Sequence, residues 1–294
     1  MAVQQHIRNP IEWGWDQLKS TGRVMDRAAQ TIDGAWDARD TRPLVVQRIR
    51  AGDLRDVLRK GFGDFGAYRT DVIFICLAYP IAGLVFSRMV MGYGMLPLLF
   101  PLISGFAIVA PFFAVGLYEM SRRREQGTDK DWTDAFGVAT SPAIGPIIVM
   151  GLLLAGLLAL WLFAAHFIYL LSFGPEPPES LHAFADEVFT TSAGWTMTIV
   201  GIGVGFLFAL VAAIISVVTF PLLLDRNVGV TTAITTSIRV VRSNPGTMAL
   251  WGLTIAVGLV IGALPLLLGL AIVLPVLGHA TWHLYRKVLP RPER

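Results

Sequence analysis

The sequence predicts an all-α fold, a polytopic bundle of transmembrane helices. Of its 294 residues, 54% are hydrophobic and 15% are charged, whereas soluble domains carry roughly 25% charged residues. Six apolar segments are each long enough to cross the hydrocarbon core, which takes roughly 20 residues of helix. The segments do not alternate in polarity, so we expect helices and not the strands of a barrel.

The six predicted spans divide the chain into three parts. Residues 1–44 form a basic, amphipathic N-terminal segment, residues 45–289 the membrane domain and residues 290–294 a C-terminal tail. The last two spans are short, and a tight turn at Pro265 separates them. The spans lie near Val72–Val90, Leu96–Tyr118, Ile147–Leu171, Trp195–Leu223, Met248–Leu264 and Leu266–Trp282.

The distribution of Lys and Arg predicts the orientation in the membrane. Twelve of the 24 basic residues precede the first span, and later connections and the C-terminus on the same side carry most of the others. Only Arg88 falls on the opposite side, where the loop "GPEPPESLHAFADEVFTTS" carries four acids and no base. Since loops rich in Lys and Arg stay inside, we expect both termini to be cytoplasmic.

Three segments on the predicted cytoplasmic side resemble one another: "RIRAGDLRDVLRKGFGDFGAYR", "REQGTDKDWTDAFGVATSPAIG" and "RNVGVTTAITTSIRVVRSNPG". Each predicts a Gly turn and a short amphipathic helix in the membrane interface. New helices are then expected to begin at Ser141-Pro142 and at Asn244-Pro245. We therefore expect three copies of one unit, an interfacial helix followed by two spans, although any amphipathic connector ending in Pro would look similar. Apolar residues recur at helical spacing at Leu54, Val57, Leu58, Phe62 and Phe65, at Trp132, Ala135, Phe136 and Ala139, and at Val230, Ala233, Ile234, Ile238 and Val241.

The N-terminal segment "IEWGWDQLKSTGRVMDRAAQTIDGAWDA" predicts a further amphipathic helix. Ile11, Trp15, Leu18, Val24 and Met25 fall on one face of it. Such a basic helix binds anionic headgroups or a partner protein, and a mobile tail is the alternative.

Several strings resemble a bacterial integral-membrane family of unknown function. They are "MLPLLFPLISGFAIVAPFFAVGLYEMSRRREQG", "PLLLDRNVGV" with "NPGTMALWG", and "LPVLGHATWHLYRKV", and the similarity covers roughly residues 45 to 289. The resemblance implies a polytopic helical fold in the bacterial inner membrane. Members are sometimes labelled as cytochrome c oxidase subunit I.

The sequence has five histidines, which can be compared with the number and placement that this label requires. Oxidase subunit I needs several buried histidines for two haems and a copper, whereas here only His166 lies well within a span, without a second His to face it. The catalytic label is therefore excluded, and an accessory role beside such a complex stays open. We expect His166 to form a hydrogen bond between helices, with a proton or ligand site as the alternative.

His279 and His283 stand four residues apart on one helix face, a spacing that could bind a metal or bracket a haem edge. No nearby Cys, Asp or Glu supplies a third ligand, and Trp282, Tyr285 and Arg286 surround the pair. Aromatic and cationic residues at the end of a span favour anchoring in the interface. We expect anchors, no bound metal and no cofactor, with haem as the disfavoured alternative.

Four charged residues stand at span ends and are candidate contacts for a ligand or a partner. Arg88 and Glu119 can extend their heads to water, and Asp225 and Arg226 are expected to pair or to cap a helix. The string "GFGDFG", Gly61 to Gly66, matches G-x-G-x-x-G in letters, but no strand precedes it, so we expect a packing feature.

The sequence therefore favours a non-catalytic accessory, assembly or scaffold subunit of a membrane complex, which could be respiratory. Its partners would be the lipid bilayer and a membrane protein or further copies of itself, and not nucleic acid. No nucleophile–base pair or phosphate loop is visible, and Cys76 is the single cysteine, so an enzyme is not expected. The alternative is a carrier or channel for a small neutral or apolar solute, because Pro97, Pro101 and Pro111 interrupt one span.

Overall fold

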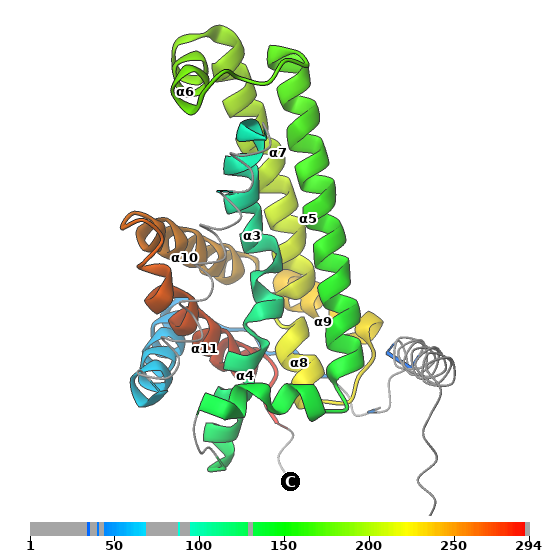
Figure 1. The fold of residues 1–294 in the computed structure, drawn as a ribbon. Coiled ribbons are helices and arrows are strands. Elements are labelled where there is room, and N and C mark those ends of the chain that lie inside the picture. Colours follow the sequence, from blue (N-terminus) through cyan, green and yellow to red (C-terminus); the bar gives the residue numbers. More distant parts are fainter. Residues whose placement is uncertain are drawn as a thin grey trace, which may run out of the picture.

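The computed structural model describes residues 34–35, 40, 44–68, 88, 95–128 and 132–291, and its ordered elements in this part of the chain are all helical. The predicted all-α class is therefore confirmed (Figure 1). A helix of residues 51–68 comes first. It is followed by η1 (Leu96–Leu98), α3 (Leu99–Phe113), α4 (Val115–Gln126), η2 (Trp132–Thr140), α5 (Ile144–Phe173), α6 (Leu181–Thr190), α7 (Ser192–Ser216), α8 (Thr219–Asp225), α9 (Val230–Ser243), α10 (Pro245–Ala263) and α11 (Leu270–Val288).

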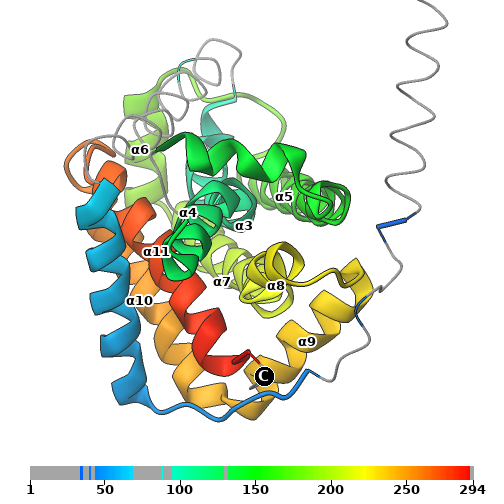
Figure 2. The ribbon, with the colours of Figure 1, turned by 90° about the horizontal axis from the view of Figure 1, so that it is seen from below.

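The long helices α3, α5 and α7 stand side by side (Figures 1 and 2). Their close packing depends on one indole and two glycines. Trp161 of α5 is buried, and its Nε1 donates to the Pro101 carbonyl of α3 at 2.9 Å. A Cβ atom on Gly105 or on Gly205 would lie 2.8 or 2.9 Å from the Trp161 ring. Small residues of this kind let membrane helices approach closely.

Four helices within the described ranges are long and apolar enough to cross a membrane: Leu96–Gln126, Ile144–Phe173, Ser192–Asp225 and Pro245–Ala263. The second to fifth predicted spans coincide with them. The first predicted span, near Val72–Val90, lies outside the described residues apart from Arg88. The sixth does not correspond to a candidate span, so the predicted count of six is not confirmed.

Helices α10 and α11 form a hairpin that differs in direction from the long helices. Helix α10 runs across the axes of α5 and α7, which Figure 2 shows nearly end-on. The turn predicted at Pro265 is present at residues 264–269, where Leu266 and Leu267 have positive φ angles of 51° and 68°. The second half of α11 carries histidines and basic residues, which explains why the predicted sixth span does not qualify.

The three segments that resemble one another take different forms, and the predicted repeat is not confirmed. Residues 51–68 and α9 are α-helices, whereas η2 is a 3₁₀-helix. Helix α10 begins at Pro245 with Asn244 as its N-cap residue, as predicted. The start predicted at Ser141-Pro142 is wrong, because α5 begins at Ile144. There the Ser141 hydroxyl accepts a hydrogen bond from the Ala143 amide within the preceding turn.

The buried face of the 51–68 helix differs from the predicted one. Leu54, Val57, Asp64 and Tyr68 are buried, and Phe62 is 58% exposed. A Cβ atom added at Gly61 would lie 2.7 Å from the Ala280 Cβ and 2.8 Å from the Val276 carbonyl oxygen. The glycine therefore sets the contact of this helix with α11, and this contact turns Asp64 towards the interior.

The segment of residues 44–50 before this helix is fixed by hydrogen bonds from distant residues. The Asn244 side chain accepts from the Ile49 amide at 2.8 Å and donates to the Gln47 carbonyl at 3.2 Å. The Gln47 amide in turn donates to the Val288 carbonyl at 2.8 Å. Asn244 thus occupies the predicted N-cap position but uses its side chain to hold residues 47–49 and not to cap α10.

Large apolar side chains are exposed along the outer faces of α5 and α7 and at the tip of the α10–α11 hairpin. This surface suits a bilayer and not water, because soluble monomers rarely expose contiguous apolar patches of more than a few hundred Å². Representative residues are Phe163, Leu171, Ile199, Phe206, Leu264 and Leu266.

Candidate functional site

Ionisable side chains, some buried and others half-buried or exposed, gather on the helices at one end of the molecule, the end opposite to α6 in Figure 1. They come from the 51–68 helix, α4, η2, the end of α8 and the second half of α11. We call this region the polar layer, and its members include Asp64, Glu119, Ser121, Arg122, Arg123, Arg124, Glu125, Asp134, Asp225, His279, Trp282, His283, Tyr285 and Arg286.

Asp64, Ser121, His279 and His283 form a connected chain, here called the histidine cluster. Ser121 Oγ lies 2.6 Å from Asp64 Oδ2 and 2.8 Å from His279 Nδ1. His283 Nε2 lies 2.8 Å from the same Asp64 oxygen, and Arg124 Nε lies 3.4 Å from Asp64 Oδ1. Three elements distant in sequence thus meet at one carboxylate.

Protonation in the histidine cluster follows from its burial and hydrogen bonds. Burial raises the pKa of Asp64, but hydrogen bonds from His283 and Ser121 outweigh it, so the net pKa lies below the ordinary value. Ser121 therefore donates to an ionised carboxylate. Burial lowers the pKa of His279 to about 4, so this ring is neutral at pH 7 and its Nδ1–H donates to Ser121.

This arrangement leaves the Nε2 atom of His279 as an acceptor. It is buried and makes no hydrogen bond within the described residues. The Leu117 backbone lies near the ring but outside hydrogen-bond geometry with Nε2. A Cβ atom added at Gly278 would lie 2.5 Å from the Leu117 side chain, so α11 packs tightly on α4 here. A haem plane does not fit into such a contact.

The histidine cluster does not have the order of a catalytic triad. In a triad the serine donates to a histidine and the carboxylate holds the other ring nitrogen. Here Ser121 donates to Asp64 itself, and the serine is 1% exposed. No group of three or more metal-binding side chains is arranged to hold an ion in the described part of the chain. The geometry supports a structural or binding role for these residues.

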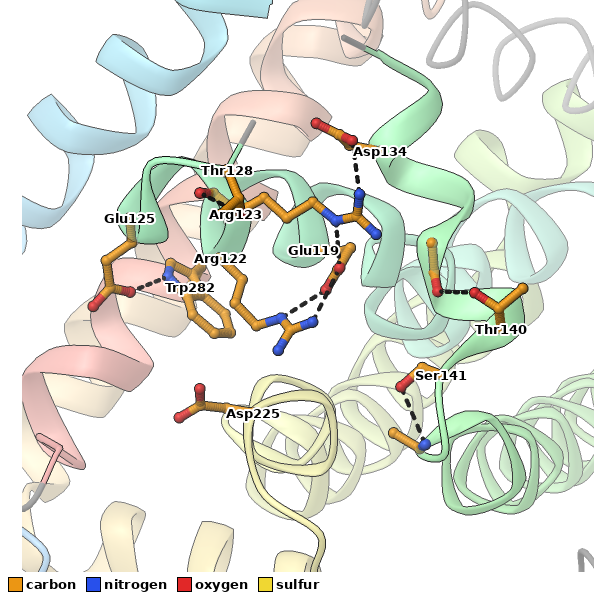
Figure 3. A network of polar contacts seen from close by, with 12 residues as sticks. Glu119, Arg122, Arg123, Glu125, Thr128, Asp134, Thr140, Ser141, Asp225 and Trp282 are labelled. Atoms are coloured by element: carbon orange, nitrogen blue, oxygen red, sulfur yellow. Dashed lines mark hydrogen bonds and ion pairs between the residues drawn. The ribbon is translucent and has the colours of Figure 1, made fainter. Parts of the chain in front are cut away.

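Glu119 is the centre of a second group, which joins α4 to η2 (Figure 3). Its carboxylate is 1% exposed and receives two hydrogen bonds from Arg122, at 2.7 and 3.1 Å, and one from Arg123 Nε at 2.7 Å. Arg123 Nη1 also reaches Asp134 of η2 at 2.8 Å. The prediction that the Glu119 carboxylate reaches water at a span end is therefore wrong. The carboxylate is buried and hydrogen-bonded within the protein.

Arg286 connects α11 to both α4 and α8. Its Nε lies 3.0 Å from Glu125 Oε1, and its Nη1 lies 3.3 Å from Asp225 Oδ2. The Tyr285 hydroxyl donates to Asp225 at 2.7 Å. Burial and the neighbouring Asp225 raise the pKa of Tyr285 well above its ordinary value, so the phenol stays protonated. Glu125 also accepts from Trp282 Nε1 at 3.0 Å (Figure 3).

The three histidines predicted as candidate site residues lie in different surroundings. His279 and His283 meet through Asp64 and Ser121, and His279 is fully buried, so the prediction of an interface anchor is wrong for it. It is also wrong for Trp282 and Tyr285, which are both buried. His166 lies exposed on α5, and its ring forms no interhelical hydrogen bond within the part of the chain described.

The remaining predicted residues do not form one site. Arg88 is exposed, and the residues on either side of it lie outside the described part of the chain. Asp225 and Arg226 do not pair with each other. Asp225 binds Tyr285 and Arg286 of α11, and Arg226 Nε lies 3.3 Å from Asp40 Oδ2.

The sequence interpretation missed Asp64, Ser121, Glu125 and Asp134. One signal could have identified Asp64, because it follows the buried Leu54 and Val57 at helical spacing and precedes Tyr68 by four residues. An acid in the apolar stripe of an amphipathic helix needs a buried partner. The other three are recognised only through partners that are distant in sequence.

These features define an integral membrane protein with several candidate transmembrane helices and a polar layer at one end of them. Residues 99–225, from α3 to the end of α8, match the family model described as "Predicted integral membrane protein (DUF2189)". The match covers less than half of the chain and includes α4 of the polar layer. It gives no support to the cytochrome c oxidase label. No curated protein and no solved structure matches the chain significantly.

Proposed function

We propose that the protein is a non-catalytic accessory or scaffold subunit of a membrane complex. The observation that carries the proposal is the engagement of four acids of the polar layer. Asp64, Glu119, Asp134 and Asp225 each bind a cationic or hydrogen-bonding side chain of the same chain. Catalytic and proton-coupled sites need groups that remain available for substrate or proton, whereas these groups hold the helices to one another.

The long helices support the same function. In α5, α7 and α10, His166 is the single residue among Asp, Glu, Lys, Arg and His, and it is exposed. The Pro101 carbonyl, a candidate lining of a solute pathway, already accepts a hydrogen bond from Trp161. The outer faces of α5 and α7 remain apolar and exposed, which suits lipid or the helices of a partner. Loops rich in Lys and Arg would place the polar layer in the cytoplasm of a bacterium.

Native mass spectrometry of the full chain, released from its own membranes in mild detergent, tests the proposal. We expect a reproducible mass above the 32.1 kDa of the chain that corresponds to another protein subunit. A variant that lacks residues 1–33 should bind less of this partner, because most of the N-terminal segment is then missing while Ala35 and Asp40 keep their bonds to Val230 and Asn227. A bare chain in several mild detergents would contradict the proposal. Solute flux into proteoliposomes above that of empty liposomes would then favour a carrier.

A further inference from the structure

An open cavity of about 360 Å³ lies beside the histidine cluster. Four cationic side chains from three elements line it. Lys60 comes from the 51–68 helix, Arg124 from the last turn of α4, and Arg286 and Lys287 from the end of α11. Ser121 and His283 form part of the same lining. The cavity therefore forms only when these three helices are assembled.

The charge of the cavity is positive. Asp64 and Glu125 are the two acids in its lining, so four cations face two carboxylates. The acids hold the arginines in position through the contacts of Asp64 with Arg124 and of Glu125 with Arg286. These contacts use the Nε atoms and leave both Nη groups of Arg124 without a hydrogen bond in the described residues. An anion in the cavity therefore meets oriented donors and does not have to displace the acids.

The two lysines of the lining are accessible from solvent. The side chains of Lys60 and Lys287 are 53% and 37% exposed. Lys60 Nζ lies 3.5 Å from Asp56, and Lys287 Nζ lies 3.0 Å from Asp53. Exposed pairs of this kind contribute little to stability, so both ammonium groups can turn towards a bound anion at little cost.

The position of the cavity indicates which anion it binds. Arg124 stands in the last turn of the candidate span Leu96–Gln126, where lipid headgroups begin. Arg binds phosphate oxygens in a fork, and basic pockets between membrane helices bind anionic headgroups. We propose that this cavity binds the phosphate group of an anionic phospholipid. The proposal does not depend on the scaffold function.

Lipid titration of the full chain, followed by native mass spectrometry, tests the proposal. Lys60→Gln with Lys287→Gln removes two charges from the cavity. Arg55→Gln with Arg59→Gln removes two from a separate, more open hollow along the same helix and is the matched control. Each basic residue near an anionic surface contributes about 1 kcal/mol, so the cavity variant should bind phosphatidylglycerol roughly 30-fold more weakly. The control variant should bind within about threefold of the wild type.

Equal losses in the two double variants would show diffuse attraction to the helix and would overturn the proposal. Equal binding of phosphatidylcholine and phosphatidylglycerol by the wild type would overturn it as well. Arg124→Lys keeps the charge but removes the fork, so weaker binding in this variant supports bidentate recognition. Competition by inorganic phosphate distinguishes a lipid phosphate from free phosphate. Displacement of the lipid would show that the site also takes free phosphate, and lack of displacement would show that the site is specific for the lipid.

Discussion

Replacing His279 by Asn is expected to reduce the dependence of the protein's stability on pH. The Asn amide can take the place of the imidazole Nδ1, which lies 2.8 Å from Ser121 Oγ, and can donate the same hydrogen bond. Asn does not titrate. The variant therefore removes the ionisable group and keeps the contact, while Asp64, His283 and Arg124 around the ring are present in both proteins.

The size of the effect follows from the burial of the ring. Burial lowers the pKa of His279 from 6.5 to about 4 in the folded protein. Between these values the unfolded chain carries a proton that the folded chain excludes, so the free energy of unfolding falls as the pH falls from 6.5 towards 4. One pKa unit corresponds to about 1.4 kcal/mol, so the whole loss is roughly 3 kcal/mol, of which roughly 2 kcal/mol falls between about pH 7.5 and about pH 5.

Unfolding in detergent, followed by tryptophan fluorescence at both pH values, measures this difference. The wild type should lose roughly 2 kcal/mol more than His279→Asn, which corresponds to roughly 3 °C in Tm for a chain of 294 residues. His182→Asn is the matched control, because His182 is exposed in α6 and its replacement should leave the pH dependence unchanged. If the wild type and His279→Asn lost stability equally, burial would not exclude the proton from the His279 ring in the folded state.

Three further predictions follow from local geometry. Asn244→Ala leaves the buried amide of Ile49 without its acceptor, so we expect a loss of about 1–3 kcal/mol and faster tryptic cleavage of the segment before the 51–68 helix; an unchanged cleavage rate would contradict this. Gly61→Val should separate the 51–68 helix from α11 and lower the free energy of unfolding by about 1–3 kcal/mol. Gly63→Val is the control and should lower it little, because no atom lies within 4 Å of the new Cβ. Equal Tm values for the two variants would refute the close contact at Gly61. Leu266→Cys at the hairpin tip, in a chain without its native cysteine, should resist an impermeant maleimide added on the side of α6, because α10 lies across the long helices; labelling from that side would show that the hairpin crosses the membrane.

The helical fold was predictable from hydropathy, and the exceptions have physical reasons. Uniformly apolar segments predicted α5 and α7 because lipid demands such surfaces along the whole helix. The prediction of a sixth span was not confirmed, because its apolar stretch begins in the turn of residues 264–269 and continues into α11. The second half of α11 is too polar for a membrane-spanning helix. Hydropathy measures composition and not direction, so the transverse course of α10 left no signal in the sequence.

The candidate site was less predictable, because its contacts join residues that are distant in sequence. His279 and His283 were identified by their spacing, but their shared partner Asp64 lies 219 residues from His283. Asp64 stands within "GFGDFG", where the glycines drew attention to packing. Glu125 and Arg286 are separated by 161 residues, and no local pattern indicates that such a pair will form.

The polar layer explains how apolar helices can adopt one arrangement. Lipid is as apolar as a leucine side chain, so burial of apolar surface does not favour one contact between membrane helices over another. Hydrogen bonds between side chains do discriminate, because a buried charge without its partner costs about 3–5 kcal/mol. The bond of Ser121 to Asp64 and that of Tyr285 to Asp225 join segments 57 and 60 residues apart. The arrangement of α4, α8, α11 and the 51–68 helix is therefore specified at the polar end, and the same requirement brings the four cations of the cavity together.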